Sequence, residues 1–118
     1  MVERPLKLSA IKARRDFLAL RGRKGVSTPG FLLLARENGE NGCDIRFGIT
    51  VTKKLGNAVK RNRIKRRLRA VCRQILPEHA PPGCDLVLIA RQAAYDRNFE
   101  ALLDDMKGAL LRLPQHPK

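Results

Sequence analysis

The sequence contains no tryptophan, one tyrosine and four phenylalanines among its 118 residues. It is also poor in negative charge, with 11 acidic residues against 25 lysines and arginines, which gives a formal net charge of +14. An imbalance of this size favours a polyanionic partner, either nucleic acid or, less often, an anionic membrane surface.

Residues that bind metals or act as nucleophiles are scarce. Cys43, Cys72 and Cys84 show no CxxC spacing and lie in apolar patterns, so we expect buried, reduced thiols rather than a disulfide or a zinc site. His79 and His116 fall in a proline-rich loop and in the C-terminal tail, and the carboxylates are scattered. The sequence therefore predicts no catalytic residue and no metal site on the protein.

Long hydrophobic runs are absent as well. The longest, such as residues 86–90, are far too short to span a membrane, and the charged N-terminal segment does not resemble a signal peptide. We therefore expect a cytoplasmic protein. Its length and its hydrophobic content of 43% predict a single domain over residues 1–118, with an irregular lead-in at 1–9 and a short tail at 114–118.

Periodicity and turn signals predict an α+β fold with the order αβββαβα. The expected helices cover residues 10–21, 58–76 and a segment beginning at Asn98, with Asn57 as an N-cap and Pro77 as a terminator. The expected strands begin near Val26 and cover 31–37, 43–52 and 84–91. The strands on either side of the long helix should be parallel, which gives an α-β sandwich with a mixed, four-stranded sheet.

The strand at residues 43–52 has two different faces. Apolar residues alternate there with arginine, glycine and threonine, so one face should pack on helices and the other should be open. The run at 84–91 is continuously apolar, which predicts a strand covered on both faces.

Most of the charge excess lies in one segment. Residues 53–73 read KKLGNAVKRNRIKRRLRAVCR and hold ten of the 25 basic residues, and no acidic residue occurs from Ile45 to Pro77. Because repulsion among so many cations is unfavourable, the segment indicates a binding surface for a polyanion.

Helical spacing divides this segment into two sides. The apolar side, which predicts a core contact, consists of Ile64, Leu68, Val71, Cys72 and Ile75. The opposite side carries a strip suited to a phosphate backbone, formed by Asn62, Arg66, Arg69 and Arg73. A solvated helix face is the alternative, but the lack of acidic partners favours binding.

Arg61 departs from this division because it falls in the apolar arc. Near the start of the helix it would project over the end of the sheet, close to Lys53 and Lys54. The three cations would form a rim at the helix N-terminus, whose unpaired N–H groups and dipole suit a phosphate. Gly56 would allow the backbone to approach such a ligand closely.

The segment KKLGNAVKRNRIKRRLR, residues 53–69, closely resembles the signature of the protein subunit of bacterial ribonuclease P. The flanks agree in order, with DF at 16–17, FLLL at 31–34, FGITVTKK at 47–54 and DLVLIAR at 85–91. The resemblance extends over nearly the whole chain, from about Leu8 to Leu113.

The resemblance implies a division of labour. In this family an RNA subunit uses Mg²⁺ to hydrolyse the phosphodiester that joins the 5′ leader to precursor tRNA, and the protein binds the catalytic RNA and the leader. The implied partners are these two RNAs, with no membrane, no cofactor on the protein and no obligate protein partner. The family fold also implies a left-handed βαβ crossover, contrary to the usual handedness.

The resemblance also implies two groups of binding residues. The RNA-binding group surrounds the RNR sequence and consists of Lys53, Lys54, Asn57, Lys60, Arg61, Asn62, Arg63, Lys65, Arg66, Arg69 and Arg73. The leader-binding cleft, formed by the first helix and the open sheet face, matches Phe17, Phe31, Thr50 and Thr52, and its rings would stack on unpaired bases. Many members have further aromatics where this chain has Arg21 and Leu34, so leader binding here should depend more on charge.

Two alternatives remain open at the level of sequence. A ribosomal or other structural RNA-binding protein would show the same charge and size, although it would not require RNR after KKLGN. A protein-only nuclease would need a general base, a metal cluster or an activated nucleophile, for which the sequence offers little.

Overall fold

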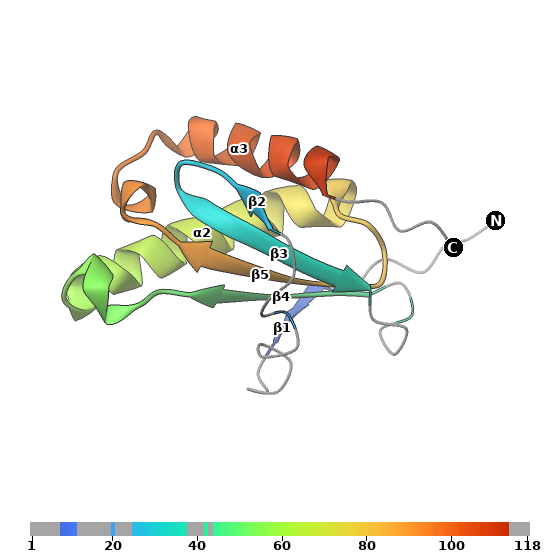
Figure 1. Ribbon diagram of the computed structural model, residues 1–118, viewed down its shortest axis with the longest axis horizontal. Helices are drawn as coiled ribbons and strands as arrows, with labels where there is room; N and C mark the ends of the chain where they lie inside the picture. The colour runs from blue at the N-terminus through green and yellow to red at the C-terminus, as the bar shows by residue number, and fades with distance from the viewer. Residues whose placement is uncertain (1–7, 12–19, 21–24, 38–41, 43, 114–118) are drawn as a thin grey trace.

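The computed structural model describes residues 8–11, 20, 25–37, 42 and 44–113. Within these residues, a twisted sheet packs against two helices (Figure 1). The strands are β1 (Leu8–Ala10), β2 (Val26–Ser27), β3 (Phe31–Glu37), β4 (Ile45–Thr50) and β5 (Cys84–Ala90). The helices are α2 (Ala58–His79) and α3 (Phe99–Arg112), and each follows a short 3₁₀ turn, η2 (Lys53–Leu55) or η3 (Gln92–Tyr95).

The sheet is mixed and has the order β1-β4-β5-β3-β2. Strands β1, β4 and β5 run parallel, whereas β3 is antiparallel to both β5 and β2. The predicted α+β class and mixed sheet are confirmed, but the sheet has five strands rather than four.

The additional strand corrects the prediction for the N-terminus. Residues 8–10 form β1 instead of the end of an irregular lead-in and the start of a helix. Leu8 pairs with Ile45, and Ile11 N–H donates to the carbonyl of Phe47 at 2.8 Å. A strand of three residues has little periodicity of its own, and its partner lies more than thirty residues away along the chain. The rest of the predicted first helix lies outside the described residues, except for Ile11 and Leu20, neither of which is helical.

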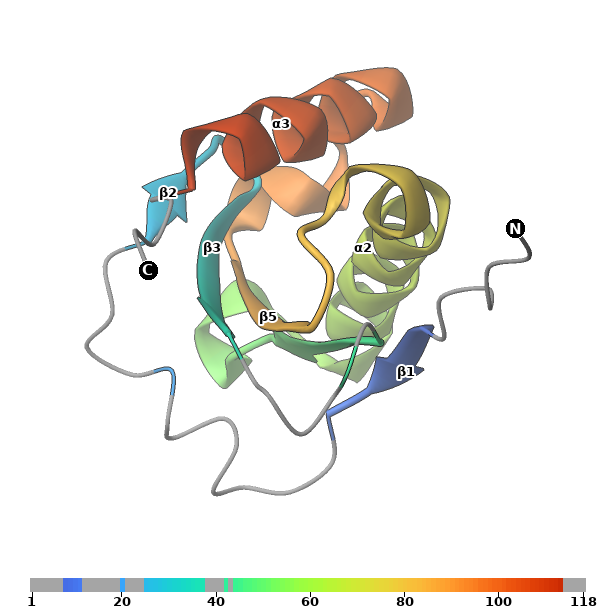
Figure 2. The same ribbon diagram turned by 90° about the vertical axis from the view of Figure 1, so that its right-hand side faces the viewer.

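The connection from β4 through α2 to β5 joins adjacent parallel strands and is left-handed, as Figures 1 and 2 show. This agrees with the expectation from the family resemblance and differs from the usual right-handed crossover. As a result, α2 lies over the β1–β4 side of the sheet and α3 over the β2–β3 side (Figure 2).

Apolar side chains cover both faces of the sheet. On the helix side, alternate residues such as Phe47 and Leu88 join the buried stripe of α2 in the main core. On the other face, Ile11, Leu20, Leu34 and Val87 form a smaller buried cluster, so this face is not open at its centre. The expectation that β5 is covered on both faces is confirmed, because six of its seven residues are buried.

Helix ends follow the predicted capping residues with one exception. Asn57 accepts a hydrogen bond from Lys60 N–H at 2.9 Å, and Asn98 accepts one from Ala101 N–H at 3.2 Å. Pro77, predicted to end α2, lies inside the helix, which continues to His79. In the last turn a proline costs a single N–H bond, and the helix continues past it because Ala80 N–H still reaches the carbonyl of Leu76 at 3.0 Å.

Candidate nucleic-acid interface

The basic residues of α2 lie on both flanks of its buried stripe. The predicted stripe is confirmed, since Ile64, Leu68, Val71 and Cys72 have no exposed surface and Ile75 is 6% exposed. At 100° per residue, one cationic row (Lys65, Arg69, Arg73) falls on one side of this stripe and another (Lys60, Arg63, Arg67) on the other. The predicted RNA-binding group contained all of these cations except Arg67 and did not divide them, but the structure gives the two rows different neighbours.

The first row lines a groove of 280 Å³ between α2 and the edge of the sheet. Its three cations are exposed and follow one another at intervals of four residues. The opposite wall comes from β1, Ile11 and the middle of β4, and no carboxylate occurs among the described residues that line it. The groove therefore has a row of cations along one wall and, among its described residues, no acid to offset them, which suits the backbone of a nucleic acid.

The second row faces η3. Arg63 Nε donates to the carbonyl of Tyr95 at 2.9 Å, and the Lys60 ammonium and the Arg63 guanidinium each lie 5.0 Å from the centre of the Tyr95 ring. These distances are within the range of cation–π attraction. Tyr95 was absent from the predicted site, because its position beside α2 depends on the return of the chain through β5.

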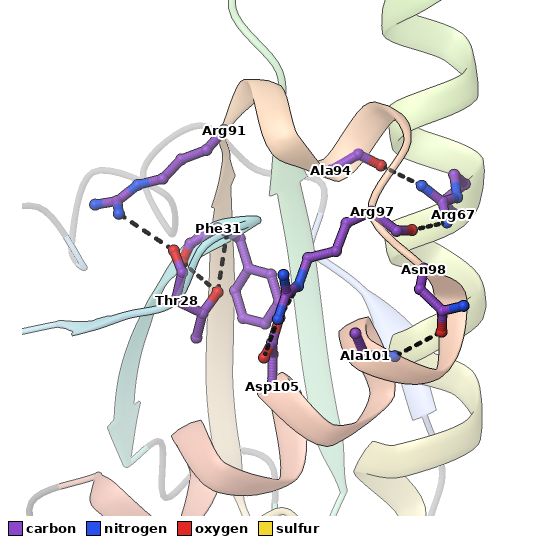
Figure 3. Close-up of polar contacts among 9 residues, drawn as sticks. All are labelled: Thr28, Phe31, Arg67, Arg91, Ala94, Arg97, Asn98, Ala101 and Asp105. Atoms are coloured by element: carbon purple, nitrogen blue, oxygen red, sulfur yellow. Dashed lines mark hydrogen bonds and ion pairs between the residues drawn. The ribbon is translucent and has the colours of Figure 1, made fainter.

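Arg67 completes the second row and has a structural role. It donates to the carbonyl of Ala94 at 2.7 Å and to that of Arg97, which ties the segment after β5 to α2 (Figure 3). Burial and the nearby Arg63 lower the pKa of Arg67, and Asp96 opposes them. The same segment is fixed to α3 by the ion pair of Arg97 and Asp105 at 2.7 Å, and the hydrogen bond that Arg97 donates to the Asp105 carboxylate raises the pKa of Arg97.

The start of α2 differs in detail from the predicted phosphate rim. Lys53 and Lys54 are exposed in η2, as expected. Arg61, however, is half-buried and turns back so that its Nε donates to the carbonyl of Gly56 at 3.1 Å. Gly56 has φ of 135°, a conformation that side chains rarely adopt, and a Cβ there would lie 2.7 Å from Lys60 Cδ. Glycine is required at this position by the backbone itself.

The remaining predicted residues of the helix, Asn62 and Arg66, are both exposed on its outer side. They lie between the two cationic rows and extend the charged surface around the helix. Asn57 combines exposure with the capping bond described above, so it has a structural role at the same surface.

Three of the four residues predicted to form the leader-binding cleft lie among the described residues. Phe17 lies outside the described residues. Thr50 is half-buried at the end of β4, on the face away from the helices, and Thr52 is exposed just beyond it.

Phe31 does not belong to this face. Its side chain is fully buried in the main core on the helix side, and Figure 3 shows the ring on the α3 side of β3. The prediction that its ring lines the cleft is therefore wrong. The residues of β3 that point to the other face are Leu32 and Leu34, one residue out of step with Phe31.

An arginine–aspartate cluster on that face was not predicted. Asp85 has no exposed surface, and its carboxylate accepts bonds from Arg46 Nε and Nη2 at 2.9 and 2.7 Å. Arg36 Nε and Nη2 donate to the same carboxylate at 3.1 and 3.0 Å. One feature of the sequence could have indicated this cluster, namely the single acidic residue in the apolar run of β5, because a buried carboxylate requires a cationic partner. The two guanidinium groups are held side by side across three strands.

The described residues offer no activated nucleophile among their thiols. Cys72 and Cys84 are buried and reduced, as predicted. Burial raises the pKa of Cys72 to about 12, and burial together with the charges of Glu37 and Asp85 raises the pKa of Cys84. Both thiols therefore stay protonated and unreactive near neutral pH. Cys43 lies outside the described residues.

The described residues contain no cluster of three or more histidine, cysteine or carboxylate side chains that is placed to hold a metal ion. None of the helices described is both long and apolar enough to cross a membrane.

The left-handed α-β sandwich and its doubly cationic helix define a small basic protein of the nucleic-acid-binding class. The model of the ribonuclease P family matches residues 7–114 of the chain. A ribonuclease P protein component from Caulobacter vibrioides is 42% identical over 115 residues, which cover 96% of this chain and 77% of that one. The corresponding protein from Erythrobacter litoralis is 43% identical over 112 residues, covering 95% and 88%.

Solved structures agree with these relatives. The ribonuclease P protein from Thermotoga maritima superposes with a TM-score of 0.76 at 31% identity, covering 90% of this chain and 98% of that one. The protein from Staphylococcus aureus gives a TM-score of 0.72 at 33% identity, covering 86% and 92%. The chain belongs to the ribonuclease P protein family.

Proposed function

We propose that this chain is the protein subunit of a bacterial ribonuclease P, which removes the 5′ leader from precursor tRNA. It would bind the catalytic RNA subunit through α2 and the leader through the sheet face away from the helices. Such a role in tRNA maturation would place the protein in the cytoplasm.

The observation that carries this proposal is the groove lined by Lys65, Arg69 and Arg73. Residues four apart on a helix follow one another at about 6 Å along its axis, so the three cations form a regular row. Among the described residues, no carboxylate lines the groove, and α2 as far as Pro77 contains no acidic residue. Phosphates can therefore approach the row without displacing an internal ion pair.

The leader would lie on the other side of the sheet. Thr50 and Thr52 offer hydroxyl groups near the start of α2, and the Arg36–Asp85–Arg46 cluster adds guanidinium groups at the other end of the strands. Phe17, which matches a cleft residue of the family, would contribute a ring that stacks on an unpaired base. Contacts of this kind tolerate different leader sequences, because they read backbone charge and ring faces rather than base edges.

Hydrolysis itself would be performed by the RNA subunit with Mg²⁺. The contribution of the protein would be to neutralise phosphate repulsion between the two RNAs and to hold the leader in place. Both effects should matter most when Mg²⁺ is scarce, because divalent cations otherwise screen the same charges.

Reconstitution with the catalytic RNA of the same organism tests this proposal. At low Mg²⁺, we expect the protein to restore cleavage at the 5′ end of mature tRNA, and the triple variant Lys65→Gln, Arg69→Gln, Arg73→Gln to lose most of this effect. A matched control, Lys107→Gln with Arg112→Gln, removes exposed charges from α3 and should behave almost like the wild type.

Two results would contradict the proposal. Cleavage by the protein without any RNA subunit would show that it carries its own active site. Losses in proportion to the number of charges removed, three in the groove variant and two in the α3 control, would show that total charge matters and that the groove has no special role.

A further inference from the structure

Tyr95, the single tyrosine of the chain, lies beside two cations of α2. The Lys60 ammonium and the Arg63 guanidinium are each 5.0 Å from the centre of its ring. The negative face of an aromatic ring attracts cations at such distances. A single ring thus holds two like charges that are three residues apart on one helix.

The ring is itself held firmly in place. It is half-buried and packs against the main core at the end of η3. Its backbone carbonyl accepts the bond from Arg63 Nε, and Arg67 binds the carbonyls of Ala94 and Arg97 on either side. Tyr95 therefore presents a fixed surface to the side chains of α2.

The use of a ring in place of a carboxylate has an electrostatic consequence. Within the described part of the chain, neither Lys60 nor Arg63 forms an ion pair with an acidic residue. Asp96, the acid that follows Tyr95 directly in the chain, is exposed and acts on Arg67. A carboxylate would order the two cations but cancel part of their charge, whereas an aromatic ring orders them and leaves the charge available to an anion.

We infer that Tyr95 is a positioning residue, whose ring holds Lys60 and Arg63 as a preorganised cationic pair for an RNA phosphate. The inference rests on the proposed role of α2 in RNA binding and adds a second contact surface to it, on the flank opposite the groove. Preorganisation increases affinity because less side-chain freedom is lost when the phosphate binds.

Two substitutions distinguish the effect of the aromatic ring of Tyr95 from the effects of its hydroxyl group and of its apolar volume. Tyr95→Phe keeps the aromatic face and removes the hydroxyl, whereas Tyr95→Leu keeps apolar volume and removes the face. In NMR spectra of the free protein, ring currents should shift the ε-methylene protons of Lys60 upfield in the wild type and in Tyr95→Phe. The shift should vanish in Tyr95→Leu, and its absence in the wild type would overturn the inference.

Binding to the catalytic RNA of the same organism, measured over a range of salt concentrations, supplies the second readout. We expect Tyr95→Phe to match the wild type and Tyr95→Leu to bind about threefold to tenfold more weakly, in line with the loss of two exposed cation–π contacts. Equal weakening in both variants would overturn the inference, because the ring face would then be irrelevant. Unchanged binding in Tyr95→Leu would also overturn it.

A double-mutant cycle distinguishes positioning from a general loss of stability. In a background with Lys60→Gln and Arg63→Gln, replacing Tyr95 by leucine should have almost no further effect on RNA affinity. Additive losses would show that Tyr95 acts independently of the two cations. Should Tyr95→Leu unfold the protein, Tyr95→Met supplies a more flexible apolar replacement for the same cycle.

The outcomes also separate this inference from the proposed function. If the wild type fails to bind the catalytic RNA, the proposed function itself fails, whatever the NMR shifts show. If the wild type binds and the cycle shows no coupling, only the role of Tyr95 is lost.

Discussion

The carboxylate of Asp85 on β5 accepts two hydrogen bonds from the guanidinium of Arg46 on the adjacent parallel strand, at 2.9 and 2.7 Å. The strand register places the two residues directly opposite each other. Arg36 on β3, opposite Asp85 on its other side, binds the same carboxylate. One fully buried acid thus links three strands on the face away from the helices.

Replacing this acid should destabilise the protein strongly. In Asp85→Asn the two arginines, whose side chains are 21% and 25% exposed, lose a charged partner in a partly dry environment. We expect a loss of about 3 kcal/mol in the free energy of unfolding, measured by urea denaturation. Asp105→Asn removes the acid of a more exposed pair on α3 and should cost less than about 1 kcal/mol. Similar losses in both variants would contradict the structural role assigned to Asp85.

Arg66 and Arg67 are adjacent in the sequence, but their substitution should change the stability of the protein to very different extents. Arg67→Ala removes the donors for two backbone carbonyls and should cost about 2 kcal/mol of stability, with faster hydrogen exchange around η3. Arg66→Ala removes an exposed side chain and should change stability by less than about 0.5 kcal/mol.

RNA binding supplies the complementary measurement for this pair. If Arg66 contacts a phosphate, Arg66→Ala should reduce the slope of log affinity against log salt by about one unit at most. An unchanged slope would show that Arg66 does not face the RNA.

Asn57 combines a structural role with its position at the interface. Asn57→Ala should lose about 1 kcal/mol of stability, because the N–H of Lys60 loses its acceptor. Asn57→Asp preserves the cap and adds a negative charge near the helix N-terminus, so stability should be kept while RNA affinity falls. Thermal unfolding and RNA titration of the same two variants separate the effects, and equal RNA affinity in Asn57→Asp and the wild type would place the RNA elsewhere.

The two phenylalanines assigned to the cleft should behave differently. Phe31→Ala creates a cavity in the main core and should cost about 3 kcal/mol or more of stability, with equal losses of affinity for precursor and mature tRNA. Phe17→Ala should weaken binding of precursor tRNA by about 1 to 3 kcal/mol and spare mature tRNA. Equal effects of Phe17→Ala on both substrates would argue against a leader contact.

The buried thiol of Cys72 predicts a loss of stability at high pH. Burial raises its pKa from the ordinary 9.0 to about 12 in the folded protein, so between these values the unfolded chain has released the proton and the folded chain still holds it. The unfolded state then binds fewer protons, and the free energy of unfolding falls by up to about 1.4 kcal/mol per pH unit. Below pH 9 this contribution to stability is fully present.

Denaturation over this pH range checks the contribution of the thiol. Cys72→Ala should be less stable than the wild type at neutral pH, because it leaves a small cavity, but its stability should decline less steeply above pH 9. Equal pH profiles in the two proteins would show that Cys72 titrates normally.

Local pattern was sufficient to predict much of the fold and the charged helix. The alternation in β4, the apolar stripe of α2 and the caps at Asn57 and Asn98 each depend on residues a few positions apart. The acid-free basic segment indicated a polyanion for the same reason, and the long RNR-containing signature pointed to the family.

Tertiary structure decided which neighbours those residues meet. The pairing of Leu8 with Ile45, the burial of Phe31 under α3 and the contact of Tyr95 with Lys60 all join segments that are distant in the sequence. Periodicity specifies the direction in which a side chain points from its own helix or strand, but it does not specify what lies there. The cations of α2 could therefore be predicted from the sequence. Their division into a row in the groove beside β1 and a pair beside Tyr95 is determined by the packing of distant segments against the helix.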